Sequence, residues 1–107
     1  MAQLPLTGWP KCVLQELIRY IEYIANRREI NEFYIGRGID LDERRRQHGC
    51  DDIIALYETD SIDNAIEVEN ALINRFYGHP KCSNDAPHGG GGVSEEYKYQ
   101  VYLAIWF

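Results

Sequence analysis

Three side chains that suit phosphate chemistry lie close together in the first half of the sequence. Tyr34 stands at the end of a short apolar run, and Arg44 and His48 follow it, four residues apart. Residues with that spacing share one face of a helix, so Arg44 and His48 should point the same way. An arginine can hold a phosphate through paired hydrogen bonds, and a tyrosine or a histidine can move a proton. Taken without other evidence, the charged run around Arg44 is also typical of a solvated helix face.

A carboxylate stands where an apolar residue is expected. From Asp60 or Ser61 to about Tyr77 apolar residues recur at helical spacing, and Glu69 interrupts their stripe. A buried carboxylate is costly unless it is paired or bound to a metal, and carboxylates hold Mg²⁺ or Mn²⁺ in phosphoryl chemistry. The alternative is that Glu69 lies at the rim of the core and pairs with an arginine. Without a metal, its apolar and acidic surroundings should raise the pKa of Glu69.

The elements that must position these residues follow from hydrophobic periodicity and turn residues. Apolar spacing and capping residues predict helices at 11–28, at 40–49 and from 60 or 61 to 77. Runs of aromatic and β-branched residues predict strands at 32–36, 51–59 and 99–107. The strand at 99–107 has apolar residues on both faces, which places it at or near the centre of the sheet, next to 32–36. The expected class is α/β, with a small, mainly antiparallel sheet of about three strands flanked by helices.

The segment 78–97 is the irregular part of the chain. It contains Gly89–Gly92, which we interpret as a flexible flap beside the site. Asn84 lies in the same segment and by itself is typical of a turn. An alternative zinc site would use His79, Cys82, His88 and Cys50. Their spacing matches no common structural zinc site.

Length and charge limit what the chain can be. Its 107 residues fit one small domain, 1–107, with a core at 32–77. The net charge of -6 argues against tight, non-specific binding to long duplex DNA, because affinity for phosphate backbones comes largely from Lys and Arg. The charge is uneven: four arginines lie within ten residues, namely Arg37, Arg44, Arg45 and Arg46. The stretch 51–69 has seven acidic residues and no Lys or Arg.

The cellular compartment follows from the cysteines and from the apolar runs. Three widely spaced cysteines do not form a disulfide framework, so reduced thiols are expected. No apolar run approaches the roughly 20 residues that span a bilayer, and the first residues lack the pattern of a signal peptide. We therefore expect a cytoplasmic protein that does not associate with a membrane.

The order of the candidate residues resembles the core of the GIY-YIG nuclease family. The run Y-I-G-x7-R-x3-H, from Tyr34 to His48, is similar to the family's Y-I-G motif and the residues that follow it. The segment A-x3-E-x2-L-I, Ala65–Ile73, is similar to the family's helix with the metal-binding glutamate. Asn84 lies where the family commonly has an asparagine near the site. The resemblance covers roughly 32–84, and the ordered set is more specific than any single motif.

One strand of the family is missing from its usual place. In the family, a G-I-Y strand precedes the Y-I-G strand and pairs with it, whereas here the residues before Glu32 predict a helix. The C-terminal V-Y-L-A, with Tyr102, looks like the missing strand. We therefore expect a circular permutation, in which the C-terminal strand pairs antiparallel with 32–36 and brings Tyr102 beside Tyr34.

The resemblance implies hydrolysis of phosphodiester bonds in nucleic acid or a nucleotide, with one Mg²⁺ or Mn²⁺ ion. By this resemblance Tyr34, alone or with His48, helps to deprotonate the attacking water. Arg44 stabilises the charged phosphorus centre, and Glu69 holds the metal. The remaining residues complete the pocket by hydrogen bonds: Tyr102 and Asn84.

The alternative is a non-catalytic module of the same fold that binds a nucleotide or inhibits a partner protein. The acidic balance and the missing strand favour this alternative. The ordered residues favour the enzyme, since a pure scaffold has no evident reason to keep Glu69 on an apolar stripe. Family members usually carry a separate recognition domain, for which this chain leaves no room. Either the core recognises the substrate, or a partner protein supplies the targeting.

Overall fold

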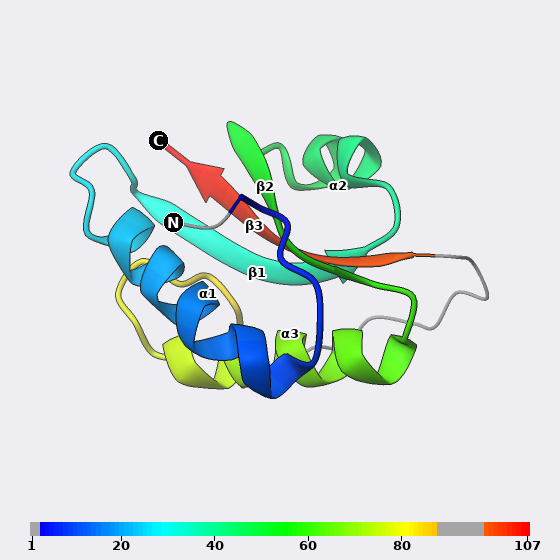
Figure 1. The fold of residues 1–107 in the computed structure, drawn as a ribbon. Helices are drawn as coiled ribbons and strands as arrows, with labels where there is room; N and C mark the ends of the chain where they lie inside the picture. Colours follow the sequence, from blue (N-terminus) through cyan, green and yellow to red (C-terminus); the bar gives the residue numbers. More distant parts are fainter. Residues whose placement is uncertain (1–2, 88–97) are drawn as a thin grey trace.

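The computed structural model describes residues 3–87 and 98–107, which form three helices and three strands. The helices are α1 (Pro10–Ala25), α2 (Leu41–His48) and α3 (Ile62–Phe76). The strands are β1 (Glu32–Gly38), β2 (Asp52–Thr59) and β3 (Tyr99–Trp106). The antiparallel sheet has α1 and α3 on one face and α2 on the other (Figure 1). The predicted α/β class, with a small antiparallel sheet flanked by helices, is therefore confirmed.

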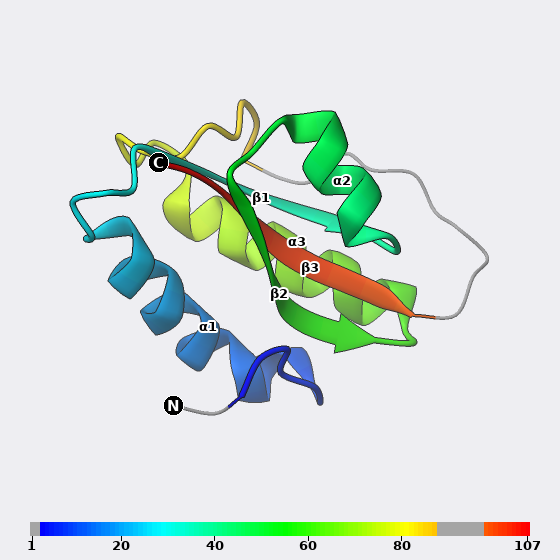
Figure 2. The ribbon, with the colours of Figure 1, turned by 90° about the horizontal axis from the view of Figure 1, so that it is seen from above.

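β3 is the central strand. The strand order is β1-β3-β2, and β3 runs antiparallel to both neighbours (Figure 2). Gly36 lies opposite Tyr102, and Tyr34 lies opposite Ala104. The predicted position of the C-terminal strand, beside 32–36, is confirmed. The circular permutation that suggested this position stays a hypothesis.

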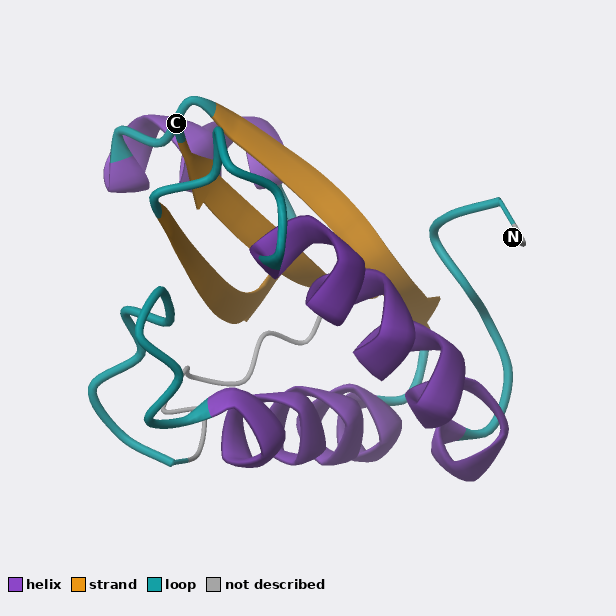
Figure 3. Cartoon of the chain, turned by 90° about the vertical axis from the view of Figure 1, so that its left-hand side faces the viewer, coloured by secondary structure: helices purple, strands orange, loops and turns teal. Residues whose placement is uncertain are grey.

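β1 presents side chains to both faces of the sheet, because successive residues of a strand point in opposite directions. Phe33 and Ile35 are buried in the main core with α1 and α3, which lie on the same side of the sheet (Figure 3). Tyr34 packs on the opposite face, in a smaller cluster that includes Tyr102 and Cys50. Since β1 is an edge strand, groups from the two faces can approach each other around its edge.

Two predicted element ends are wrong, and in each case a distant segment is the cause. The first helix ends at Ala25 instead of residue 28. There the ammonium group of Lys81 donates hydrogen bonds to the carbonyls of Ala25 and Arg27, at 2.8 and 3.0 Å. β1 continues beyond residue 36 to Gly38, because β3 supplies partners for both extra residues.

Asp40 is the N-cap of α2, as predicted, and Ser61, one of the two residues predicted for α3, is the N-cap of that helix. The Asp40 carboxylate accepts a hydrogen bond from the backbone N–H of Glu43 at 3.1 Å. The Ser61 hydroxyl accepts one from the N–H of Asn64 at 3.2 Å. Each bond satisfies an N–H group that the first helical turn leaves without an internal partner. The cap at Asp40 fixes where α2 begins, and hence where its arginines and His48 lie over the sheet.

Candidate active site

Two tyrosines and a histidine from three different elements meet on the α2 face of the sheet. The rings of Tyr34, on β1, and His48, at the end of α2, have centroids 4.8 Å apart. Nε2 of His48 lies 2.8 Å from the phenol oxygen of Tyr102, on β3. The structure therefore brings together three of the residues that the sequence singles out.

Gly36 and Gly38 make room for these groups on β1. A β-carbon at Gly36 would lie 2.6 Å from Cζ of Tyr102 and 3.0 Å from Cε1 of Tyr34. A β-carbon at Gly38 would lie 2.9 Å from Nε of Arg44. Alternate residues of a strand share a face. The two glycines therefore leave a strip of bare backbone that the phenols and the guanidinium group cover.

Gly36→Ala should lower the free energy of unfolding by about 1–3 kcal/mol, the usual range for forcing extra atoms into a packed site. The new methyl group would displace Tyr102 from its hydrogen bond with His48. Urea unfolding measures the loss of stability, and the imidazole NMR signals of His48 report the broken contact. In a Tyr102→Ala background the same substitution should lose most of its effect. An equal loss in both backgrounds would exclude the contact with Tyr102 as the cause.

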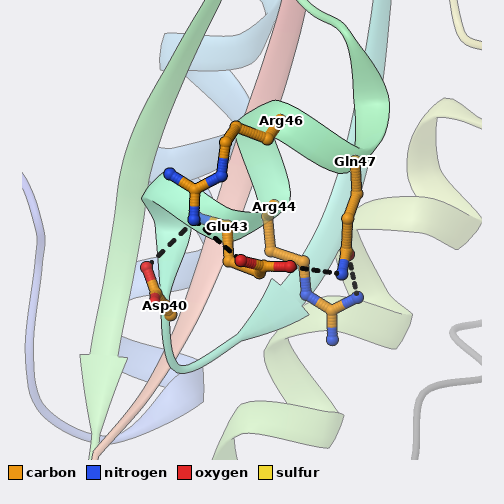
Figure 4. Close-up of polar contacts among 5 residues, drawn as sticks. All are labelled: Asp40, Glu43, Arg44, Arg46 and Gln47. Carbon is orange, nitrogen blue, oxygen red and sulfur yellow. Dashed lines mark hydrogen bonds and ion pairs between the residues drawn. The ribbon is translucent and has the colours of Figure 1, made fainter.

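The arginines of α2 have different partners. Arg46 binds the Glu43 carboxylate at 2.7 Å, whereas Nη1 of Arg44 donates to the neutral Gln47 amide at 3.2 Å (Figure 4). Arg45 donates to a backbone carbonyl beyond the helix. Arg46 is therefore neutralised by an acid, and Arg44 presents its positive charge beside β1. This arrangement favours Arg44 as the phosphate ligand.

Glu69 is buried on the apolar face of α3, as predicted, and it is paired there with Arg37. Oε1 of Glu69 accepts a hydrogen bond from Nη1 of Arg37 at 2.7 Å, and only 5% and 6% of the two side chains are exposed. Burial raises the pKa of Glu69, although Arg37 and Arg44 oppose the shift, so the predicted direction is confirmed. The alternative interpretation, in which Glu69 pairs with an arginine, is therefore correct about the pair. The pair is buried, however, instead of lying at the rim of the core.

Arg37 is the site residue that the sequence analysis missed. The signal was strand alternation, since Arg37 follows Phe33 and Ile35 at intervals of two and shares their buried face. The prediction that the strand ends at residue 36 leaves Arg37 outside this alternation. Arg37 also gives Glu69 a structural reason to lie on an apolar stripe. The position of Glu69 on that stripe therefore no longer favours an enzyme over a scaffold.

Among the described residues, the surroundings of Glu69 do not on their own form a site for a divalent cation. Oε1 of Glu69 is already bound by Arg37, and Arg44 adds a second positive charge within electrostatic range. In the described part of the chain, no group of three or more His, Cys, Asp or Glu side chains is placed to hold a metal ion. Mg²⁺ is commonly held by one or two carboxylates together with substrate phosphates and water. Glu69 and a bound phosphate would therefore hold the ion together.

Asn84 holds the outer edge of β1. Its Oδ1 accepts a hydrogen bond from the backbone N–H of Ile35, and its Nδ2 donates to the carbonyl of the same residue, both at 2.9 Å. The neighbouring segment continues this pairing, since the N–H of Ser83 donates to the carbonyl of Phe33. Both polar atoms of the Asn84 amide therefore bind the backbone of β1, the strand that carries Tyr34.

Burial sets the protonation states of the three rings. Burial raises the pKa of Tyr102 to about 12 and also raises the pKa of Tyr34, so both phenols are protonated at neutral pH. Burial, with a further contribution from Arg44, lowers the pKa of His48 below its usual 6.5, so the imidazole is neutral. Of the three rings, His48 is therefore the one best able to accept a proton, and the Tyr102 phenol lies within hydrogen-bonding distance of it.

The structure separates the residues of the alternative zinc site. Cys50 lies in the cluster on the α2 face, whereas Cys82 packs against the main core, where its N–H donates to the carbonyl of His79. His88 and the predicted glycine flap fall in 88–97, outside the described residues. All three cysteines are free thiols, as expected.

Comparisons with known proteins assign no family. No family model, no curated protein sequence and no solved structure matches the chain. Across residues 3–87 and 98–107, no helix combines the length and apolar character needed to cross a membrane. The function of the site is therefore inferred from its geometry and from its ordered motifs.

Proposed function

We propose that this protein is a metal-dependent hydrolase of phosphodiester bonds in nucleic acid or a nucleotide, with a site similar to that of the GIY-YIG nucleases. One observation carries the proposal. Tyr34, Tyr102 and His48 meet on one face of the sheet, beside Arg44, whose hydrogen-bond partner is a neutral amide. A positively charged side chain that can bind phosphate thus lies close to a neutral side chain that can accept a proton. Hydrolysis of a phosphodiester needs these two groups most.

The proposed reaction begins with a phosphate bound to Arg44, which stabilises negative charge as it develops. Water attacks phosphorus and gives a proton to the phenol oxygen of Tyr102, while Tyr102 gives its own proton to Nε2 of His48. A P–O bond forms to the water oxygen, and the P–O bond to the leaving oxygen breaks. Tyr34, which stays protonated, can donate a hydrogen bond to the phosphate. Glu69 would hold Mg²⁺ or Mn²⁺, which supplies charge neutralisation at the leaving oxygen.

A second candidate function is supported by the buried ion pair. Because Arg37 neutralises Glu69, the carboxylate has a role without any metal. The same site would then capture the phosphate of a nucleotide, or the fold would cover a site on a partner protein, without catalysis. Binding of a nucleotide that neither requires Mn²⁺ nor leads to product would be the signature of this function.

A cleavage assay over DNA, RNA, dinucleotides and cyclic nucleotides, with Mg²⁺ or Mn²⁺, tests the proposed hydrolysis. We expect product from at least one of these classes, and we expect a chelator to abolish it. A His48→Ala variant prepared in parallel excludes a contaminating nuclease. Nucleotide binding without product formation, under all these conditions, would support the binding module instead.

The setting proposed for this activity is the cytoplasm. The three cysteines are free thiols, which reducing compartments maintain. We propose a partner protein as one source of target recognition.

The rate of cleavage should fall as the pH drops below the pKa of His48, because the reaction needs the neutral imidazole. That pKa lies below 6.5 in the folded protein, so the acidic limb should lie in that range. The unfolded chain binds this proton more readily, so stability should also decrease as the pH falls from 6.5 through the folded-state pKa. A pH titration of the His48 NMR signals locates the pKa directly.

Arg44→Gln should raise the pKa of His48, since the positive charge of Arg44 helps to lower it. The NMR signals of the other two histidines are the internal control. An unchanged titration of His48 in this variant would contradict the proposed proximity of the two groups.

A further inference from the structure

A groove of about 510 Å³ lies between the N-terminal segment, the end of β2 and the start of α3. The residues that line it include Thr7, Trp9, Glu58, Asp60, Asn64 and Lys98. None of these residues takes part in the proposed hydrolysis. β2 and β1 are opposite edges of the sheet, so the groove lies away from Tyr34 and Arg44.

Hydrogen bonds fix the backbone on both sides of the groove. The N-terminal segment pairs with β2 through Leu6, whose N–H donates to Leu56 and whose carbonyl accepts from Glu58, both at 2.9 Å. The Tyr57 hydroxyl donates to the carbonyl of Gly8. On the other side, two side-chain hydrogen bonds hold the turn that precedes α3. The groove is therefore formed before any ligand binds.

The chemistry of the groove favours a planar cation. Trp9 is one of the residues that line the groove, and it is 68% exposed. Glu58 and Asp60 supply two carboxylates, against the single ammonium of Lys98, which lies 4.0 Å from Glu58. Tryptophan is the aromatic side chain that attracts cations most strongly. A ring and an excess of carboxylates in one groove thus select a positively charged group.

The wider charge pattern points to a basic partner. Five of the lining residues come from the stretch 51–69, which contains seven acidic residues and no Lys or Arg. This local field repels phosphate-bearing ligands and attracts cationic ones. Apart from Glu69, the acidic residues of this stretch have no role in the proposed hydrolytic site, whose cations and rings come mainly from β1, α2 and β3.

We propose that the groove binds an arginine side chain from a basic segment of a partner protein. The guanidinium group would lie over the ring of Trp9 and donate hydrogen bonds to the carboxylates of Asp60 and Glu58. Arginine fits these groups better than lysine, because its planar fork matches a carboxylate and stacks on aromatic rings. A partner bound at the β2 edge leaves the site beside Tyr34 and Arg44 open to substrate.

Tryptophan fluorescence tests this proposal on the full chain. The chain has two tryptophans, so Trp106→Phe leaves Trp9 as the single reporter. The probe is the peptide acetyl-Gly-Arg-Gly-Arg-Gly-amide, and its control carries citrulline, the neutral isostere, in place of each arginine. We expect a saturable fluorescence change with the arginine peptide, and binding at least about tenfold weaker with the citrulline peptide.

Two matched variants locate the binding. Asp60→Asn should weaken binding of the arginine peptide about tenfold, whereas Asp42→Asn, the same change on the exposed face of α2, should leave it within about twofold. Circular dichroism verifies that each variant is folded. Equal effects of the two variants, equal affinity for the two peptides, or no saturable change would each overturn the proposal. A saturable change with adenosine monophosphate alone would assign the groove to a nucleobase and would overturn it as well.

Discussion

Replacing Arg44 by alanine should lower the rate of metal-dependent phosphodiester cleavage at least about a hundredfold, a typical effect of removing one positioned, charge-stabilising donor. The guanidinium group lies against Gly38, on the face that carries Tyr34 and Tyr102. Its hydrogen bond to Gln47 leaves its charge available to a phosphate. The loss should appear in kcat, because the negative charge is greatest in the transition state. Single-turnover cleavage measures this step without interference from product release.

Arg46 provides a matched control for this substitution. Arg46 lies two positions further along the same helix, and a carboxylate already neutralises it. Arg46→Ala should therefore change the rate less than about threefold, as expected for an exposed ion pair. Both variants should keep the melting temperature of the parent within a few degrees, since neither guanidinium belongs to the core. If the two substitutions reduce cleavage equally, the arginines of α2 form a general basic surface, and the role of Arg44 fails.

Periodicity in the sequence was sufficient to predict the sheet and its central strand. The apolar residues on both faces of 99–107 predicted a central or near-central strand, and the structure has β3 between β1 and β2. The antiparallel pairing that brings Tyr102 near Tyr34 was predicted from the resemblance to the GIY-YIG family, and β3 does pair antiparallel with β1. Helical spacing also located Glu69 on the buried face of α3. The strands and the buried position of Glu69 depend on patterns within one segment, which a single sequence contains.

Contacts between distant segments could not be predicted in this way. Lys81 ends α1 through carbonyls more than fifty residues away, and no glycine or proline marks that end in the sequence. Asparagine is typical of turns, yet the amide of Asn84 binds the backbone of β1. To predict the partner of Glu69, one must know where β1 ends, and pairing with β3 sets that end. In each case tertiary pairing decides a feature that local signals leave open.

Glu69→Gln should lower the free energy of unfolding by about 3 kcal/mol, the lower end of the range for breaking a buried ion pair. Sequence reasoning alone favours the opposite result, because a neutral side chain suits an apolar stripe better than an unpaired carboxylate. Arg37 reverses this expectation, since the substitution removes the carboxylate that its buried guanidinium group binds. Urea unfolding of the variant, beside Glu67→Gln on the exposed side of the same helix, measures the difference.

A double variant separates the structural role of Glu69 from its proposed role in catalysis. Arg37→Met with Glu69→Leu replaces the buried pair by apolar side chains, a change that often restores stability. If this folded variant no longer binds Mn²⁺ in calorimetric titrations with a phosphorothioate dinucleotide, Glu69 is needed for metal binding as well as for the fold. If it binds Mn²⁺ and cleaves as the parent does, the pair is structural, and the metal site must be sought elsewhere. The titration without the dinucleotide should give much weaker Mn²⁺ binding even in the parent, because Arg37 already neutralises the carboxylate and the phosphate must supply the remaining ligands.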